Sequence, residues 1–187
     1  METPTVPLHI HALLYGVLSP FSSFLTEVLL HSQIHALHLD PSSFVLLLAF
    51  AFLCEAFVGV TPSVALLHNF FSLELVSEEE CSGYASLKMD GASVPGALDA
   101  ELLPKAEGFR QQWVQFETAE AGVMFQPPLT PATPNQEWRR EKLNDPWLMP
   151  VLTRLGKLKR AGVTMVMVVR EFICQRIGHP QRHSHPM

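Results

Sequence analysis

Apolar residues early in the chain recur at the three- and four-residue spacing that places side chains on one face of a helix. This pattern predicts helices after Pro20, after Pro41 and after Pro62. The second is apolar nearly all round, so we expect it at the centre of a helical bundle. The faces predicted for the first and third helices comprise Phe21, Phe24, Leu25, Val28 and Leu29, and Val64, Leu66, Leu67, Phe70 and Phe71.

The three predicted helices share one start signal. Ser19-Pro20, Asp40-Pro41 and Thr61-Pro62 each place a capping side chain directly before a proline. The cap accepts a backbone N–H bond, and proline suits the first turn because its missing donor is not needed there. Gly59 is placed to end the second helix. The connections are short, so we expect the three helices to pack as one unit.

Helical periodicity is lost over residues 73–122, where short β-like pieces are separated by glycine and proline. Residues 84–89 alternate polar and apolar side chains, and Trp113 to Phe116 form a second candidate strand. Alternation of this kind is typical of a half-buried strand. We therefore predict a small antiparallel sheet in the middle of the chain.

The last third is predicted to be helical again, after a proline-rich linker over residues 126–136. Asp145-Pro146 repeats the start signal, Gly162 breaks the chain, and Thr164 can cap a final helix. The apolar positions of these two helices are Trp147, Leu148, Val151, Leu152, Leu155 and Leu158, and Val166, Val169, Phe172, Ile173 and Ile177.

Together these patterns predict a mainly helical α+β protein with an N-terminal helical bundle, a small antiparallel sheet and two C-terminal helices. Residues 1–15 are expected to be a tail and residues 16–125 the main domain. The linker over 126–136, the helices over 137–178 and a mobile tail over 179–187 follow.

One apolar run raises the question of a membrane. Residues 44–54 read FVLLLAFAFLC, and Glu55 then interrupts them. A spanning helix needs about 20 mostly apolar residues, and a charge at mid-membrane depth is costly. We predict a buried core helix and no membrane contact, with a membrane anchor as the alternative.

Charge is distributed unevenly along the chain. Residues 1–109 hold two basic residues against 12 acidic ones, a net charge of −10, whereas residues 110–187 hold 11 against six, a net charge of +5. A basic C-terminal region can form a contact surface for nucleic acid, and the alternative is an ordinary solvated helix face. The candidate nucleic-acid contacts are Arg154, Lys157, Lys159, Arg160, Arg170 and Arg176.

The cysteines and the N-terminus indicate a compartment. The chain has an odd number of cysteines, namely Cys54, Cys81 and Cys174, and no two of them have metal-ligand spacing. This pattern favours free thiols in a reducing compartment. Residues 1–7 lack the basic start and the long apolar run of a secretory signal. We therefore expect an intracellular protein, with nucleus and cytoplasm both open.

An ordered set of segments resembles the gypsy-type transposase domain of plant retrotransposon-derived proteins. The set comprises GVLSPFSSFLTEVL from Gly16, Leu37-His38, Pro41-Ser42, Leu53 to Phe57, Gly59 to Pro62, Phe70-Phe71, Trp113 to Phe116 and RIGHPQRHSHPM from Arg176. The resemblance runs from about Gly16 to Met187. It departs from the family at Leu67, where a tryptophan is usual, and at His179-Pro180-Gln181. The resemblance implies a mobile-element origin and supplies no functional residues to carry over.

The sequence offers no catalytic constellation. A metal-dependent transposase needs three carboxylates that hold two metal ions. The acids here lie in an apolar helix (Glu55), in a loop-like cluster (Glu78, Glu79 and Glu80) or in a stretch rich in glycine and proline (Asp90, Asp99 and Glu101). Glu55 is expected at an edge position of its apolar helix, bonded to a neighbouring helix terminus or a histidine, and a ligand or catalytic acid is its alternative role.

Two groups of histidines could bind a metal. His31 and His35 have the four-residue spacing of a zinc pair on a helix, and His179, His183 and His185 could bind a transition metal weakly. Structural or solvated histidine is favoured in both groups, because a zinc site demands more ligands. We therefore predict no metal and no cofactor.

Three functions remain open. The favoured one is a retrotransposon-derived, non-enzymatic structural or protein-interaction domain that binds itself or a protein partner. The second is a nucleic-acid-binding accessory that uses the basic C-terminal helices. The third is a remnant of a transposase-type enzyme.

Overall fold

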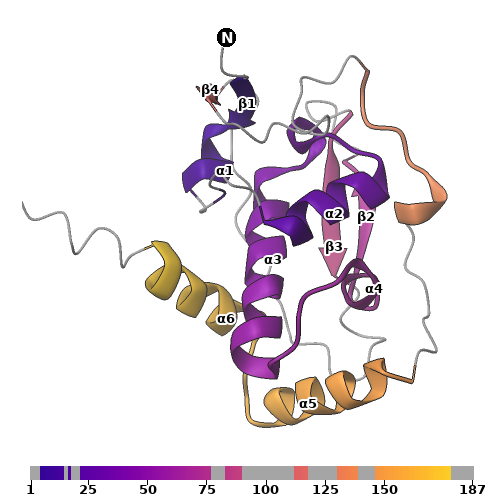
Figure 1. The fold of residues 1–187 in the computed structure, drawn as a ribbon, viewed down its shortest axis with the longest axis vertical. Helices are drawn as coiled ribbons and strands as arrows, with labels where there is room; N and C mark the ends of the chain where they lie inside the picture. Colours follow the sequence, from indigo (N-terminus) through magenta and orange to yellow (C-terminus); the bar gives the residue numbers. More distant parts are fainter. Residues whose placement is uncertain are drawn as a thin grey trace, which may run out of the picture.

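The computed structural model describes residues 5–14, 17, 22–76, 83–89, 112–117, 130–138 and 146–177. The predicted α+β class is confirmed: the described chain is mostly helical, with two small antiparallel sheets. Helix α3 (Pro41–Phe52) runs through the middle, with β2 and β3 on one side, α6 on the other and α5 below it (Figure 1). Its apolar side chains therefore meet neighbours on several sides, as the sequence predicts.

The start and end of the central helix follow from local chemistry. The Asp40 side chain accepts hydrogen bonds from the backbone N–H and the hydroxyl of Ser42, and Pro41 occupies the first turn. The helix continues as a π-helical turn, η2 (Leu53–Val58), and ends where Gly59 adopts a φ of 74°. A left-handed residue of this kind is the common end of a helix, and glycine adopts it without strain. Both predicted signals are confirmed.

Two other predicted caps are wrong by a few residues. Helix α2 (Ser23–Ser32) is capped by Ser22, whose hydroxyl accepts from Leu25 N at 3.2 Å, and not by Ser19. Helix α4 (Val64–Leu67) is capped by Ser63, not by Thr61. In both cases the proline lies before the cap and not in the first turn: Ser22 is two residues after Pro20, and Ser63 directly follows Pro62.

The core is organised around Phe50 of α3. Its ring lies 5.9 Å from Phe24 of α2, 6.2 Å from Phe70 and 5.9 Å from Phe71. Aromatic pairs at such distances stabilise the core beyond the contribution of the apolar area that each ring buries. Phe71 belongs to a strand and not to the third helix as predicted, since α4 ends at Leu67.

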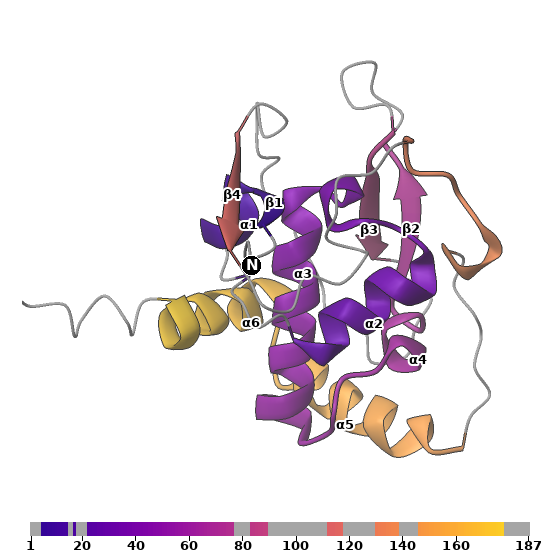
Figure 2. The same ribbon diagram turned by 45° about the horizontal axis from the view of Figure 1, so that its top comes forward.

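The predicted middle sheet is two separate sheets. Strand β2 (Phe71–Leu75) pairs antiparallel with β3 (Ala85–Met89). Strand β4 (Trp113–Glu117) pairs antiparallel with β1 (Thr5–His9), which precedes helix α1 (Ile10–Leu14). The tail expected over residues 1–15 is thus wrong for residues 5–14, where Leu8 and Ala12 are buried. The two sheets lie at opposite sides of α3 (Figure 2).

The C-terminal helices pack on the same core. Helix α5 (Leu148–Arg160) has no side-chain cap, and the predicted cap Asp145 lies outside the described residues. Gly162 breaks the chain at a φ of 84°, and the Thr164 hydroxyl caps α6 (Met165–Phe172), both as predicted. A π-helical turn, η7 (Ile173–Ile177), follows. Phe172 lies 5.9 Å from Phe52 of α3, which fastens α6 to the centre.

The segment for which a membrane anchor is the alternative is packed inside the folded protein. The segment Pro41–Val58 is long and apolar enough, by length and composition alone, to cross a membrane, and it is the one such helix within the described ranges. However, 61% of it is buried inside the folded protein. A core helix with this burial needs no lipid to cover its apolar surface.

Candidate interaction surfaces

The predicted linker contributes a docked segment. Residues 130–138, which end in a short 3-10 helix, η6 (Gln136–Trp138), lie along the outer side of β2 (Figure 1). The Ser32 carbonyl at the end of α2 accepts hydrogen bonds from Asn135 Nδ2 at 3.0 Å and from Trp138 Nε1 at 2.8 Å. Ala132 N donates to the Gly83 carbonyl at 3.1 Å. This part of the predicted linker is therefore a wall of the folded body and not a free spacer.

His38 fastens the start of this segment. Its Nδ1 accepts from His35 N at 3.3 Å, so Nε2 carries the proton and donates to the Thr130 carbonyl at 2.9 Å. Burial lowers the pKa of His38 below its ordinary value of 6.5; the Thr130 hydrogen bond opposes this shift and His35 adds to it. A neutral imidazole with both nitrogens bonded suits a structural role.

Between the docked segment and β2 lies an open groove with a volume of about 700 Å³. One wall comprises Ser72, Leu73, Glu74 and Leu75, and the other Pro134, Asn135, Gln136 and Trp138. Sequence reasoning missed this groove. Its two walls come from segments about 60 residues apart, and no local pattern predicts that they meet.

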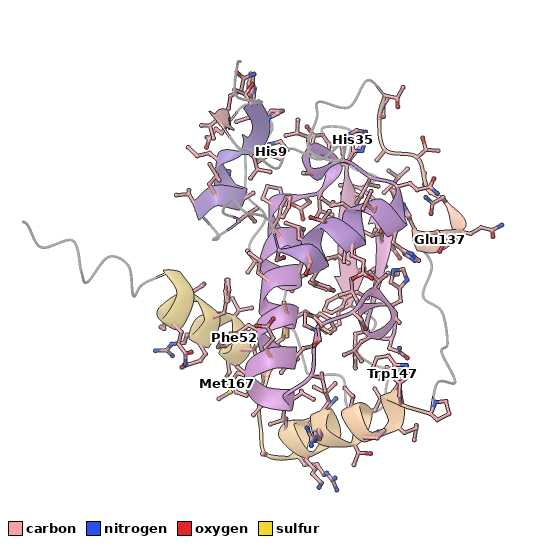
Figure 3. The ribbon with its side chains drawn as sticks, viewed as in Figure 1. His9, His35, Phe52, Glu137, Trp147 and Met167 are labelled. Atoms are coloured by element: carbon pink, nitrogen blue, oxygen red, sulfur yellow. The ribbon has the colours of Figure 1, made fainter. Side chains whose placement is uncertain are left out.

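The candidate zinc pair is not formed on one helix face. Helix α2 ends at Ser32, and Gln33 adopts a left-handed φ of 54°, which places His35 beyond the helix. His31 lies 3.1 Å from the Glu137 carboxylate, with its ring edge-on to His68, whereas His35 packs against His38. Glu137, the partner of His31, and His35 lie apart in Figure 3. His179, His183 and His185 lie outside the described residues.

Several carboxylates of the described ranges cap a helix or form an ion pair with a neighbouring side chain. Asp40 caps α3, Glu74 pairs with Lys88 at 3.0 Å and Glu137 pairs with His31. No group of three histidine, cysteine, aspartate or glutamate side chains in these ranges could hold a metal ion. The acids at positions 78, 79, 80, 90, 99 and 101 lie outside them.

Glu55 lies at an exposed edge position in the π-helical turn η2, where residues 55–57 face away from the core, and it has an interaction partner. The neighbouring Cys54 is buried, and burial, with the charge of Glu55, raises the pKa of its thiol to about 12. This thiol is therefore unreactive at neutral pH, because the thiolate is the nucleophile.

The candidate nucleic-acid contacts on α5 differ in whether their side chains are already bonded within the protein. Arg154 donates from Nη1 to the Val58 carbonyl at 2.6 Å, which closes the end of the central helix. Arg160 donates from Nε to the Gly156 carbonyl within its own helix at 3.2 Å, and Lys159 also has a partner. Lys157 is exposed on the outer side of α5.

The two remaining candidates follow in the next helix. Arg170 is exposed on α6, and the side chain of Arg176 lies outside the described part.

Helix α6 is apolar on both sides. Its inner side chains, Met165, Val168, Val169 and Phe172, are buried. On the outer side, Val166 and Met167 of α6 are 42% and 55% exposed, and Ile173, the first residue of η7, is 41% exposed. Of the apolar positions that the sequence gives for this helix, Val169 and Phe172 are buried, whereas the 3.6-residue period turns Val166 and Ile173 away from α3. Figure 3 labels Met167 on α6.

Comparison with known proteins adds one finding on origin. Residues 6–75 match the model of the family described as "Putative gypsy type transposon", which supports a transposon-derived protein. The match begins before the expected Gly16 and ends within β2. The resemblance of residues 113–116 and 176–187 lies outside the match and stays a prediction. Searches of curated proteins and of solved structures each gave no match.

Proposed function

We propose that this transposon-derived chain is a non-enzymatic protein-interaction domain that self-associates through the outer face of α6. The observation that carries the proposal is the exposure of Val166 and Met167 on α6, whose other side is already buried, together with that of Ile173 at the start of η7. Monomeric proteins rarely leave large apolar side chains grouped on one surface. An interface would remove them from water.

The same face suits a symmetric contact. Arg170 and Glu171 are both exposed beside the apolar side chains. A two-fold contact uses the same patch on both copies, so the patch must complement itself. A face that carries apolar residues and both signs of charge meets this condition when two copies of α6 pack antiparallel.

The test measures molar mass by light scattering during gel filtration. We expect a dimer for the wild-type chain and a monomer for Met167→Glu, because the new carboxylate would be buried in the interface. Met149→Glu is the matched control, since Met149 is 61% exposed on α5 and lies outside the face. A monomeric wild type, or a dimer in Met167→Glu, would overturn the proposal.

The compartment proposed for this function is the cell interior. Cys54 and Cys174 are free thiols in the described part, and no disulfide is needed to hold the core. Free thiols of this kind persist where the environment is reducing.

A nucleic-acid accessory is the second candidate, and one observation favours it. Helix α5 carries Arg154, Lys157, Lys159 and Arg160 and no acid. Contacts to phosphate release counterions, so binding would weaken steeply with salt. For a Lys157→Gln, Arg160→Gln double variant we expect the slope of log affinity against log salt to fall by about 2. Binding that is independent of salt, or of these two residues, would contradict a nucleic-acid-binding role for α5.

The third candidate, a remnant of a transposase-type enzyme, lacks support among the described side chains. A two-metal site needs converging carboxylates, and the described residues contain no group of three side chains that could hold a metal ion.

A further inference from the structure

The backbone groups of the β2–β3 sheet can be sorted by the direction in which they point. Val76 N donates to the Tyr84 carbonyl at 2.9 Å, and Val76 lies opposite Tyr84 when the register of the two strands is continued. In an antiparallel pair, hydrogen-bonded and non-bonded positions alternate. Ser72 and Glu74 therefore face β3 with their N–H and C=O groups, whereas Leu73 and Leu75 direct theirs outward.

The outer edge of β3 is already occupied. Asp40 N donates to the Ala85 carbonyl at 2.9 Å, and Leu87 N donates to Ser43 Oγ at 2.8 Å. Both groups belong to outward-facing positions of β3, which agrees with the alternation deduced for β2. The start of α3 thus closes this side of the sheet.

The outer edge of β2 faces the groove. Within the described ranges no hydrogen bond occupies the outward N–H and C=O groups of Leu73 and Leu75. Leu75 is also 39% exposed. A strand edge with free donors and acceptors is a template for another extended chain. The groove supplies the space beside it, with a volume of about 700 Å³.

We propose that the groove binds an extended segment of a partner protein, which adds to the edge of β2 as a third strand and alternates apolar with basic side chains. The groove beside Leu73 and Leu75, between β2 and the wall formed by residues 134–138, is the space that the added strand would occupy. A second copy is disfavoured, because its β2 is flanked by the same wall. Binding of this kind combines main-chain hydrogen bonds with side-chain selection.

The carboxylate of Glu74 favours basic side chains on the added strand. Glu74 lines the groove, and its side chain remains 53% exposed although Lys88 contacts it. A lysine on the added strand, directly opposite Glu74, would form a cross-strand ion pair. Among the described residues that line the groove there is no Lys or Arg. A groove whose one charged lining residue among those described is a carboxylate favours basic segments over acidic ones.

The probes are the peptides acetyl-VKVKVKV-amide and acetyl-VEVEVEV-amide, with binding measured by calorimetry on the full chain. We expect the lysine peptide to bind at least about tenfold more tightly than the glutamate peptide, and Glu74→Lys to reverse this order. An unchanged preference in Glu74→Lys would overturn the proposal.

The backbone contribution is tested separately. Two versions of the lysine peptide are N-methylated, one on the valine amides and one on the lysine amides, so that each loses the donors of one edge. We expect one version to lose at least about tenfold in affinity and the other to bind normally. Equal binding by both versions, or equal loss, would show that no strand is added.

A protein variant completes the test. Leu75→Pro removes an N–H that the β2–β3 ladder does not use, and proline is tolerated at such edge positions. We expect Leu75→Pro to lose peptide binding and the control Leu75→Val to keep it. Normal binding by Leu75→Pro would overturn the proposal, as would dimerisation through this edge without peptide binding. If Leu75→Pro does not fold, the methylated peptides decide. Because the outer face of α6 is not involved, Met167→Glu should bind the peptide normally.

Discussion

The Arg154 guanidinium on α5 donates a hydrogen bond of 2.6 Å to the carbonyl of Val58, at the end of the central helix and 96 residues away in the chain. The last carbonyls of a helix lack partners within the helix and carry partial negative charge. Arg154 supplies both a donor and a positive charge at this point. Arg154, which the sequence suggests as a nucleic-acid contact, therefore links α5 to the end of the central helix.

Replacement of Arg154 by methionine should lower the free energy of unfolding by about 1–3 kcal/mol, because it removes a charge-assisted hydrogen bond and keeps the stem. Urea unfolding followed by circular dichroism measures the loss. Lys157→Met is the control, and it should change stability by less than about 0.5 kcal/mol because the side chain is exposed. Equal effects of the two variants would contradict the structural role of Arg154.

Replacement of Trp138 by phenylalanine tests the docking of residues 130–138. The indole Nε1 donates to Ser32 O at 2.8 Å, and the ring is 2% exposed. Phenylalanine keeps much of the apolar contact and loses the donor, so we expect a loss of about 1–2 kcal/mol in the same urea experiment. Trp147→Phe is the control, because Trp147 is 45% exposed. A free spacer would give no difference between the two variants.

The two described thiols should differ strongly in reactivity. Cys174 is exposed, whereas the buried Cys54 has a pKa raised to about 12. In a Cys81→Ser background at pH 8, iodoacetamide should modify Cys174 quickly and Cys54 only after denaturation. Mass spectrometry of tryptic peptides reports both sites. Rapid modification of Cys54 in the native protein would show that η2 is open.

The His38 side chain should make the protein less stable in mild acid. Its pKa is lowered in the folded state from the ordinary value of 6.5, mainly by burial. Its contribution to stability is therefore full above 6.5 and is lost as the pH falls from there through the lowered pKa. A nuclear magnetic resonance titration should give a His38 pKa below 6.5. A value above 6.5 would contradict the neutral, doubly bonded ring.

Local signals in the sequence predicted much of the helical structure. Asp40, Gly59, Gly162 and Thr164 act where the pattern places them, because a cap or a left-handed turn depends on neighbouring residues alone. The alternation over residues 85–89 predicted β3 for the same reason. The pairing of β1 with β4 was not predictable, because it joins segments more than 100 residues apart.

The candidate surfaces were less predictable than the helices. The basic residues of α5 were recognised, yet the bond between Arg154 and Val58 depends on how two distant helices pack. The groove depends on the pairing of β2 with β3 and on the hydrogen bonds from Asn135 and Trp138 to Ser32, which hold the opposite wall in place. Tertiary contacts of this kind leave no periodic signal in the sequence.

Hydrogen exchange of Pro41–Val58 in buffer without detergent or lipid tests most directly the claim that this apolar segment is the interior of one folded body. Amides buried at the centre exchange only when the whole protein unfolds. We predict that the α3 amides are the slowest in the chain and share one opening free energy with those of Val168 to Phe172 in α6. Rapid exchange of Pro41–Val58, or protection that arises only with detergent or lipid, would contradict the account.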